Sequence, residues 1–178
     1  GAGFADLPGL AQTLDDSAQI SYSAGYATGL LLKAAGNNKA TFLGCCDLNF
    51  EKEAYLAYEL GLKAVIPDVE FSYVKTGAYD YDFDNTAGAT EAYNAAKAAG
   101  VGAVYAYLAG ALEPIVQLAN ADGIITMSAG SSTACERTDL TYNIAVKFDA
   151  GDYILEALDR IVAGTFKEGE KLVYEVGD

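Results

Sequence analysis

Short apolar runs alternate with segments of helical period along most of the chain, and this alternation most limits the folds open to it. The apolar runs have the length of strands, and the loops between them and the helical segments are short. Such an order is typical of a mostly parallel sheet with helices on both faces. The sequence therefore predicts an α/β fold of three layers. The predicted strands are 40–45, 69–74, 102–110, 124–128, 141–148 and 171–176, and the predicted helices are 21–35, 50–61, 86–99, 112–120 and 152–163.

The segment 1–16, GAGFADLPGLAQTLDD, departs from this pattern and predicts a glycine-rich turn that leads into a short helix. Its GAGF is not a dinucleotide-binding fingerprint, because no strand precedes it and no third glycine follows in register. The next helix contains Gly25 and Gly29. Each glycine costs a helix roughly 1 kcal/mol, so we expect this helix to pack closely against another element.

Charge and composition exclude several classes of partner. The 178 residues suffice for one well-buried domain, and 25 acidic against 11 basic residues give a net charge of −14. Nucleic acid and anionic lipid both need a basic surface, so neither is expected as a partner. The charge fits either solubility or the attraction of cations. The chain opens at Gly1 without methionine, which indicates processing or trimming, so the lack of a signal peptide excludes no compartment.

Three cysteines and the absence of histidine limit the chemistry. Cys45, Cys46 and Cys135 do not have the spacing of a zinc site. Without histidine, the Ser-His-Asp and Cys-His nucleophile systems are excluded. Two states of the cysteines stay open: one of the adjacent pair is bonded to Cys135, or all three are small buried side chains.

The stretch 75–91, KTGAYDYDFDNTAGATE, is dense in carboxylates and aromatic rings and joins a predicted strand to a predicted helix. Ligands of open α/β sheets bind at such junctions. The stretch fits a ligand-facing loop, a solvated acidic loop or a calcium site. The calcium interpretation rests on EF-hand spacing, although Asn85 stands where that loop needs glycine. Its predicted metal ligands are Asp80, Asp82, Asp84 and Glu91.

Other predicted junctions at the carboxyl edge of the sheet are small and polar, as in AGAL at 109–112 and SAGSS at 128–132. Such residues let a ligand approach the backbone, although they also serve as ordinary turns and caps. Lys147 is a cation at the end of an apolar strand. Its side chain either extends into solvent or donates hydrogen bonds to an oxygen-rich ligand such as a sugar hydroxyl.

Several separate passages resemble one family. SAGYATGLLLKAAGNNKATFLGCCD (23–47), GLKAV (61–65), TGAYDYDFDNTAGATEAYNAAKAAGVGAVYAYLAG (76–110) and VKF (146–148) follow, in order, the pattern of the basic membrane protein family of ABC-transporter substrate-binding lipoproteins. This resemblance implies a type I periplasmic-binding fold with two lobes. It also implies a ligand, often a purine nucleoside, held between them. The first third of a family member has no counterpart here, so we expect one lobe of a larger receptor.

The resemblance also implies roles for single residues. An aromatic ring, Tyr79 or Phe83, is expected to stack on the base, with Asp84 nearby. Gly110 is expected to offer a backbone contact and Lys147 to reach the sugar. Near Ser128 the family has an aspartate, and this chain has no carboxylate there. The predicted ligand-binding residues are therefore Tyr79, Phe83, Asp84, Gly110, Ser128 and Lys147.

The sequence thus predicts a non-enzymatic solute-binding component of an ABC uptake system, with a nucleoside or similar small polar ligand and a transporter permease as partners. It predicts an extracytoplasmic location, with a lipid anchor outside this chain, and no cofactor unless calcium binds. Residues 1–178 are expected to form one α/β domain, with 1–20 a remnant of the other lobe and 21–178 the main lobe and crossover. The alternatives are a calcium-binding structural or sensory domain and a metal-dependent phosphoester enzyme.

Overall fold

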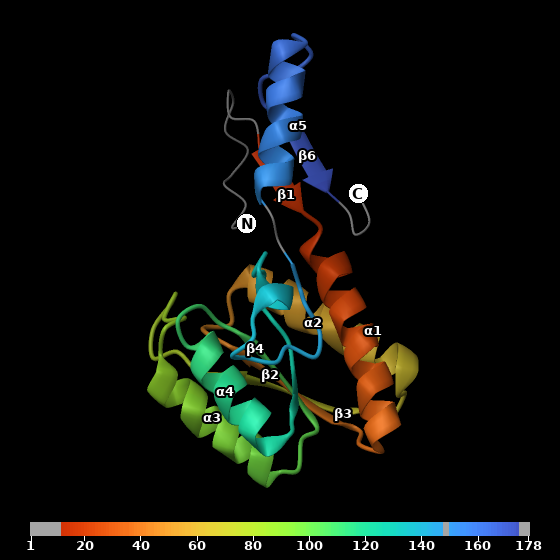
Figure 1. The fold of residues 1–178 in the computed structure, drawn as a ribbon, viewed down its shortest axis with the longest axis vertical. Coiled ribbons are helices and arrows are strands. Elements are labelled where there is room, and N and C mark those ends of the chain that lie inside the picture. The colour runs from red at the N-terminus through yellow and green to blue at the C-terminus, as the bar shows by residue number, and fades with distance from the viewer. Residues whose placement is uncertain (1–11, 148–149, 175–178) are drawn as a thin grey trace.

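The computed structural model describes residues 12–147 and 150–174, and a four-stranded parallel sheet forms its centre (Figure 1). The strand order is β3-β2-β4-β5, and every pair of neighbours is parallel. Phe42 of the second strand lies opposite Tyr73 on one side and Tyr105 on the other. The strands are β2 (Lys39–Gly44), β3 (Glu70–Lys75), β4 (Ala103–Tyr107) and β5 (Ile125–Thr126).

Four helices cover the two faces of this sheet. One face is covered by α1 (Ser17–Ala35) and α2 (Asn49–Val65), and the other by α3 (Thr86–Ala98) and α4 (Leu112–Asp122). A short 3₁₀ turn, η1 (Ala134–Glu136), follows in the long segment after β5. The layers confirm the predicted three-layer α/β fold.

Each face of the sheet has its own apolar core, because neighbouring residues of a strand point to opposite faces. On the α1–α2 face, Phe42 and Tyr105 pack with ring centroids 5.0 Å apart. On the α3–α4 face, Leu43 packs with Tyr93 and Ile115. Both faces of the two central strands are therefore buried, which explains why most of their residues are apolar.

The helices α1 and α2 cross in backbone contact. A Cβ added to Gly25 would collide with the carbonyl oxygen of Tyr58, and one added to Gly61 would collide with the carbonyl oxygen of Tyr22. Only glycine lets the two backbones approach this closely. The close packing predicted from the glycines of this helix is confirmed.

The first helix begins earlier than predicted, at Ser17 instead of residue 21. The Asp16 side chain accepts a hydrogen bond from the Gln19 N–H at 2.8 Å and so caps the helix. The helix ends at Gly36, which has the left-handed φ of 69°.

A second, two-stranded sheet forms beyond the carboxyl edge of the first (Figure 1). It pairs β1 (Gln12–Asp15) with β6 (Lys171–Tyr174) in parallel, and α5 (Ala150–Val162) precedes β6. The predicted helix before residue 17 is therefore wrong for residues 12–15. Pairing with a strand near the other end of the sequence decides that conformation, and local sequence does not carry this information. The rest of that prediction, residues 1–11, lies outside the described residues.

The predicted strand 141–148 is wrong for most of its length. Between residues 141 and 147 the structure has one bridge, Met127 to Ile144, with no continuous ladder. Hydrogen bonds between Asn143 and Thr126 extend this pairing. Residue 148 and the last two residues of the predicted strand 171–176 lie outside the described residues.

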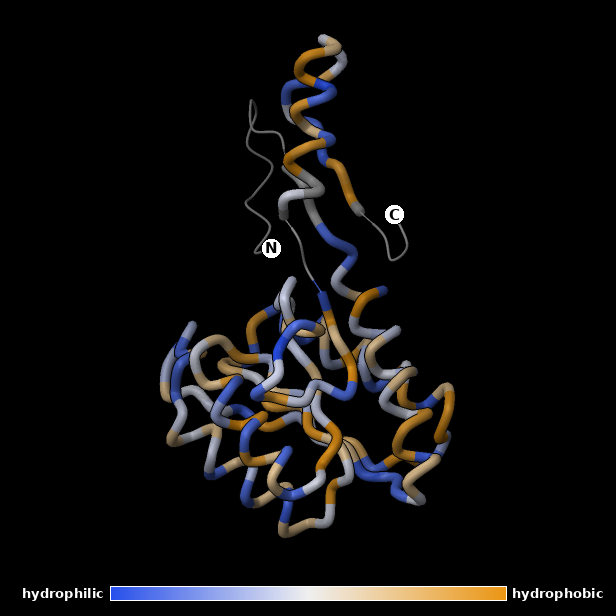
Figure 2. Tube along the Cα trace, viewed as in Figure 1, coloured by the Kyte–Doolittle hydropathy of each residue, from blue (hydrophilic) through white to orange (hydrophobic). Residues whose placement is uncertain are grey.

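Helix α5 contains several apolar residues, orange in Figure 2, and these are exposed in the described structure. A parallel sheet normally has cover on both faces, and two strands with one helix do not supply it. The assignment of 21–178 to one main lobe stays a prediction, although α5 and β6 lie with β1. No helix in the described ranges is long and apolar enough to span a membrane. The exposed apolar residues of α5 are Ile154, Leu155, Leu158, Ile161 and Val162.

Candidate functional site

A cavity of about 320 Å³ lies at the carboxyl end of β4, next to the first turn of α1. Its walls come from β4, from the acidic-aromatic loop 75–91, and from the segments that lead to the second sheet. The volume falls in the range of small-molecule sites, roughly 300–1,000 Å³. The carboxyl edge of a parallel sheet is also where such sites occur.

Aromatic rings form one wall of this cavity. Phe83, Tyr105 and Tyr107 line it. The ring of Phe50 stacks on Phe83 with centroids 6.1 Å apart and planes inclined by 26°, and this contact restrains the Phe83 ring. Tyr79, the other predicted stacking residue, is 67% exposed and is not among the lining residues. Of the two candidates, the structure brings Phe83 to the cavity.

The backbone around Phe83 is tied to the loop after β4. The Phe83 carbonyl accepts the N–H groups of Ala109 at 3.2 Å and Ala111 at 3.4 Å. Next to it, the Asp84 carboxylate accepts the Gly110 N–H at 2.6 Å. A side chain on Gly110 would place its Cβ 2.7 Å from that carboxylate oxygen. Asp84 and Gly110 are both predicted to bind ligand. In the structure they are hydrogen-bonded to each other, and this bond fixes the loop that carries Phe83.

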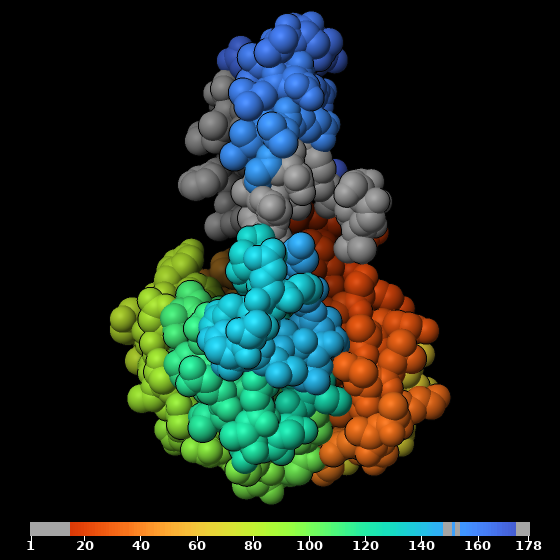
Figure 3. Space-filling model, viewed as in Figure 1, coloured from red at the N-terminus to blue at the C-terminus, as the bar shows by residue number. Residues whose placement is uncertain are grey.

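Lys147 lines the same cavity, whereas Ser128 is not among the lining residues. Ser128 is buried, and its hydroxyl donates to the Val146 carbonyl at 2.9 Å. The Gly130 N–H donates to the same carbonyl at 3.0 Å. These bonds hold the residue before Lys147 against the loop after β5. In Figure 3 the segment that follows β5, cyan to light blue, covers the body between α4 and α1.

A polar group that the sequence analysis missed completes the lining. Asp15, at the end of β1, and Ser17, at the start of α1, face the cavity beside Tyr107. Burial raises the pKa of the Tyr107 hydroxyl, and the nearby Asp15 carboxylate raises it further. The Ser17 hydroxyl is hydrogen-bonded to Tyr107 and opposes the rise. The pattern Asp15-Asp16-Ser17 contains a helix start that could have placed these residues at the sheet edge.

The carboxylates of the acidic-aromatic loop are spread over separate tasks. Asp82 accepts the Ala78 N–H and the Asn85 side-chain amide, each at 2.9 Å. The first of these bonds does most to lower the pKa of Asp82. Asn85 has φ −72° and caps α3, so it does not take the left-handed turn of a calcium loop. In the described parts of the chain, no three or more acidic or cysteine side chains gather as a metal site, and Asp80 and Glu91 are exposed.

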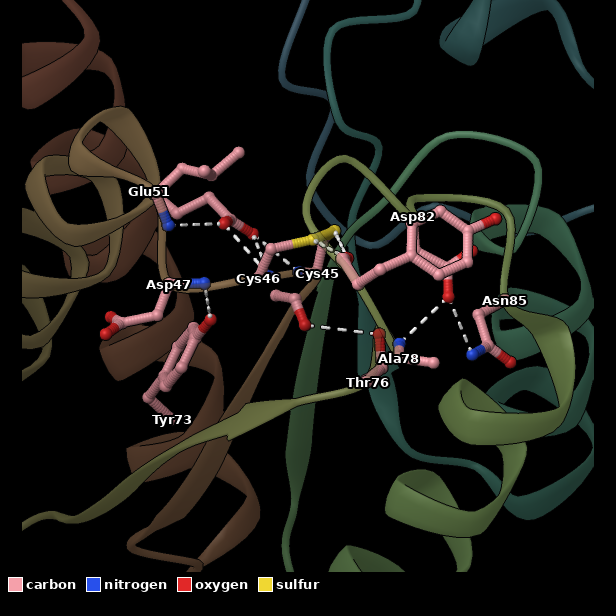
Figure 4. The surroundings of a disulfide bond; sticks show 12 residues. Cys45, Cys46, Asp47, Glu51, Tyr73, Thr76, Ala78, Asp82 and Asn85 are labelled. Carbon is pink, nitrogen blue, oxygen red and sulfur yellow. Dashed lines mark hydrogen bonds between the residues drawn. A yellow bond between two sulfur atoms is a disulfide. The ribbon is translucent and has the colours of Figure 1, made fainter.

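The turn after β2 contacts the same loop (Figure 4). Cys45 and Cys46 are bonded to each other, and Cys135 is exposed and free, so both predicted cysteine states are wrong. Cys46 Sγ lies 3.1 Å from the Tyr79 carbonyl oxygen. The buried Glu51 carboxylate accepts the N–H groups of Cys45, Cys46 and Leu48, which fixes the turn.

Comparison with known proteins places this fold among solute-binding proteins. A structure described as ABC transporter system solute-binding proteins from Aeropyrum pernix K1 matches with a TM-score of 0.70 and 19% identity, over 99% of this chain and 50% of that one. An ABC transporter system solute-binding protein from Conexibacter woesei DSM 14684 matches with a TM-score of 0.69 and 24% identity, over 98% of this chain and 56% of that one. No protein-family model and no curated protein matches the sequence.

At these identities the likeness shows the fold: the chain folds like part of an ABC-transporter solute-binding protein. It spans about half the length of the two matched structures. The finer resemblance, to the basic membrane protein family, stays a prediction.

Proposed function

We propose that this chain is the ligand-binding part of a non-enzymatic solute-binding protein of an ABC uptake system. One observation carries the proposal: Phe83 and Lys147, from distant segments, line the same cavity at the carboxyl edge of the sheet. Both were expected at the ligand from the sequence alone. The fold of the two matched solute-binding proteins supports the same role.

The ligand we propose is a nucleoside or a similar small polar molecule with a planar ring. The Phe83 ring, held by Phe50, offers a face on which a base can stack. Lys147 offers ammonium donors to hydroxyl oxygens, and Ser17 and Tyr107 add hydroxyl groups to the same cavity. One apolar wall with a few polar groups is the usual composition of a small-molecule site.

In the whole receptor, we infer, the cavity is one side of a cleft between two lobes. The second sheet and the apolar face of α5 are then the beginning of the other lobe. The matched structures are about twice as long as the aligned part, which supports this inference. The partners proposed for the full-length protein are the permease of the transporter and, through a lipid anchor outside this chain, the outer face of a membrane.

Thermal unfolding of the full-length protein with and without nucleosides tests the proposal. A ligand at a hundred times its Kd stabilises the folded state by about 2.7 kcal/mol. Phe83→Ala and Lys147→Ala are expected to reduce this stabilisation. Tyr79→Ala, in the same loop but off the cavity, is the matched control and is expected to retain it. If all three variants keep the stabilisation by ligand, the ligand binds elsewhere. If no nucleoside stabilises the wild type, the proposed ligand class is contradicted.

A further inference from the structure

The cavity carries two opposite charges. Among its described lining residues, the charged side chains are those of Asp15 and Lys147. All other lining residues are uncharged and are either apolar or hydroxyl-bearing. The site therefore has an acceptor-only group and a donor-only group within a volume of about 320 Å³.

Both charges lie on segments that join the two sheets. Asp15 is the last residue of β1, directly before the cap and first turn of α1. Lys147 lies in the segment that leads from β5 towards α5. Figure 1 shows these two segments running between the four-stranded body and the second sheet. A ligand that bonds to both charges therefore touches both connections at once.

The surroundings of Asp15 suit hydroxyl recognition. The half-buried Asp15 carboxylate is close enough to the Tyr107 hydroxyl to raise its pKa, and this hydroxyl is hydrogen-bonded to Ser17. A carboxylate bonded to a ligand hydroxyl gives a charge-assisted bond, roughly twice as strong as a neutral one. The family that the sequence resembles has an aspartate near Ser128, and this chain does not. Asp15, from another part of the chain, places a carboxylate at the cavity.

We propose that Asp15 is a specificity-determining residue that selects neutral hydroxyl-bearing ligands, such as nucleosides, over their phosphorylated forms. This inference rests on the proposed function. The Asp15 carboxylate accepts a hydrogen bond from a ligand hydroxyl. An ionised phosphate at the same point carries a like charge and has no hydrogen-bond donor for the carboxylate. The net charge of −14 disfavours the phosphate further. Discrimination comes from this repulsive contact as much as from the attractive one.

Titration calorimetry of the full-length protein with inosine, adenosine and guanosine, and with their 5′-monophosphates, tests the inference. Asp15→Asn keeps the shape of the side chain and removes its charge. Asp16→Asn is the matched control, because it removes the same charge one residue away, and asparagine still caps α1. Melting of each variant without ligand establishes that it is folded.

We expect the wild type to bind a nucleoside at least tenfold tighter than its monophosphate. Asp15→Asn is expected to weaken nucleoside binding and to reduce the ratio of the two affinities at least threefold, whereas Asp16→Asn is expected to leave this ratio unchanged. If a nucleoside binds and the ratio is the same in Asp15→Asn and wild type, the inference is overturned and the proposed function stands. An equal change in Asp16→Asn attributes the effect to overall charge and also overturns it. Failure of every nucleoside to bind overturns both.

Discussion

The backbone contact between α1 and α2 gives the most quantitative prediction. In Gly25→Ala, the new Cβ collides with the carbonyl oxygen of Tyr58, a backbone atom that cannot move without moving its helix. Overpacking of this kind costs about 3 kcal/mol when helices have to separate. Alanine stabilises a helix interior by about 1 kcal/mol relative to glycine, which acts in the opposite direction. The expected net loss is about 2 kcal/mol in the free energy of unfolding.

Urea denaturation followed by circular dichroism measures this loss as a lower midpoint at an unchanged slope. Ser23→Ala, at an exposed position of the same helix, is the control and changes the midpoint little. Gly61→Ala is expected to behave like Gly25→Ala, and the double variant to lose less than the sum, because either alanine already separates the helices. A midpoint for Gly25→Ala equal to or above that of the wild type refutes the crossing.

Three further predictions concern the loops around the site. Glu51→Gln is expected to cost about 3 kcal/mol in urea denaturation, because a buried acceptor of three backbone N–H groups becomes partly a donor, and a smaller loss contradicts its role in the turn. Asp82→Ala is expected to speed amide hydrogen exchange in residues 78–85, because it removes two hydrogen bonds of this loop, and to do so equally with and without calcium. Calcium binding by the wild type that Asp82→Ala abolishes, measured by calorimetry, contradicts this role of Asp82. The hydrogen bond to Arg137 lowers the pKa of Asp139 to about 2, so the stability it adds is complete above pH ~4 and is lost as the pH falls towards ~2. Acid titration of the melting temperature is expected to show a shallower decline for Arg137→Gln, and identical curves contradict the pairing.

The sequence predicted most of the central fold because its signals are local. Apolar runs such as 40–45 and helix-period segments such as 86–99 specify strands and helices without knowledge of their partners. The α/β class and the close packing of Gly25 followed from such signals. The conformation of residues 12–15 did not, because β1 exists only through its pairing with β6.

The candidate site was predictable only in part for the same reason. Phe83 lies in the loop between β3 and α3, and Lys147 lies in the segment between β5 and α5. The alternation of strands and helices in the sequence assigns both segments to the carboxyl edge of the sheet, where ligands bind. Asp15 lies in a segment whose strand could not be recognised. Asp84, Gly110 and Ser128 are predicted to bind ligand, but they are not among the residues that line the cavity, and their hydrogen bonds hold the neighbouring loops. Whether a polar group faces a ligand or the backbone depends on tertiary pairing that sequence spacing does not contain.

The choice between Tyr79 and Phe83 shows the limit most clearly. The two aromatic residues stand four positions apart in one loop and are equivalent by composition. The φ of 66° at Tyr81 and the hydrogen bonds of Asp82 turn the backbone between them, so that one ring packs on Phe50 and the other is exposed.

Native mass spectrometry of the full-length protein tests the central claim most directly. The protein is incubated with an equimolar mixture of nucleosides, and the mass added to the folded protein is read for wild type, Lys147→Ala, Phe83→Ala and Tyr79→Ala. The account predicts one nucleoside per chain on wild type and Tyr79→Ala, and a reduced fraction on the other two variants. No added mass on the wild type, or equal occupancy of all four proteins, contradicts a nucleoside site at this cavity.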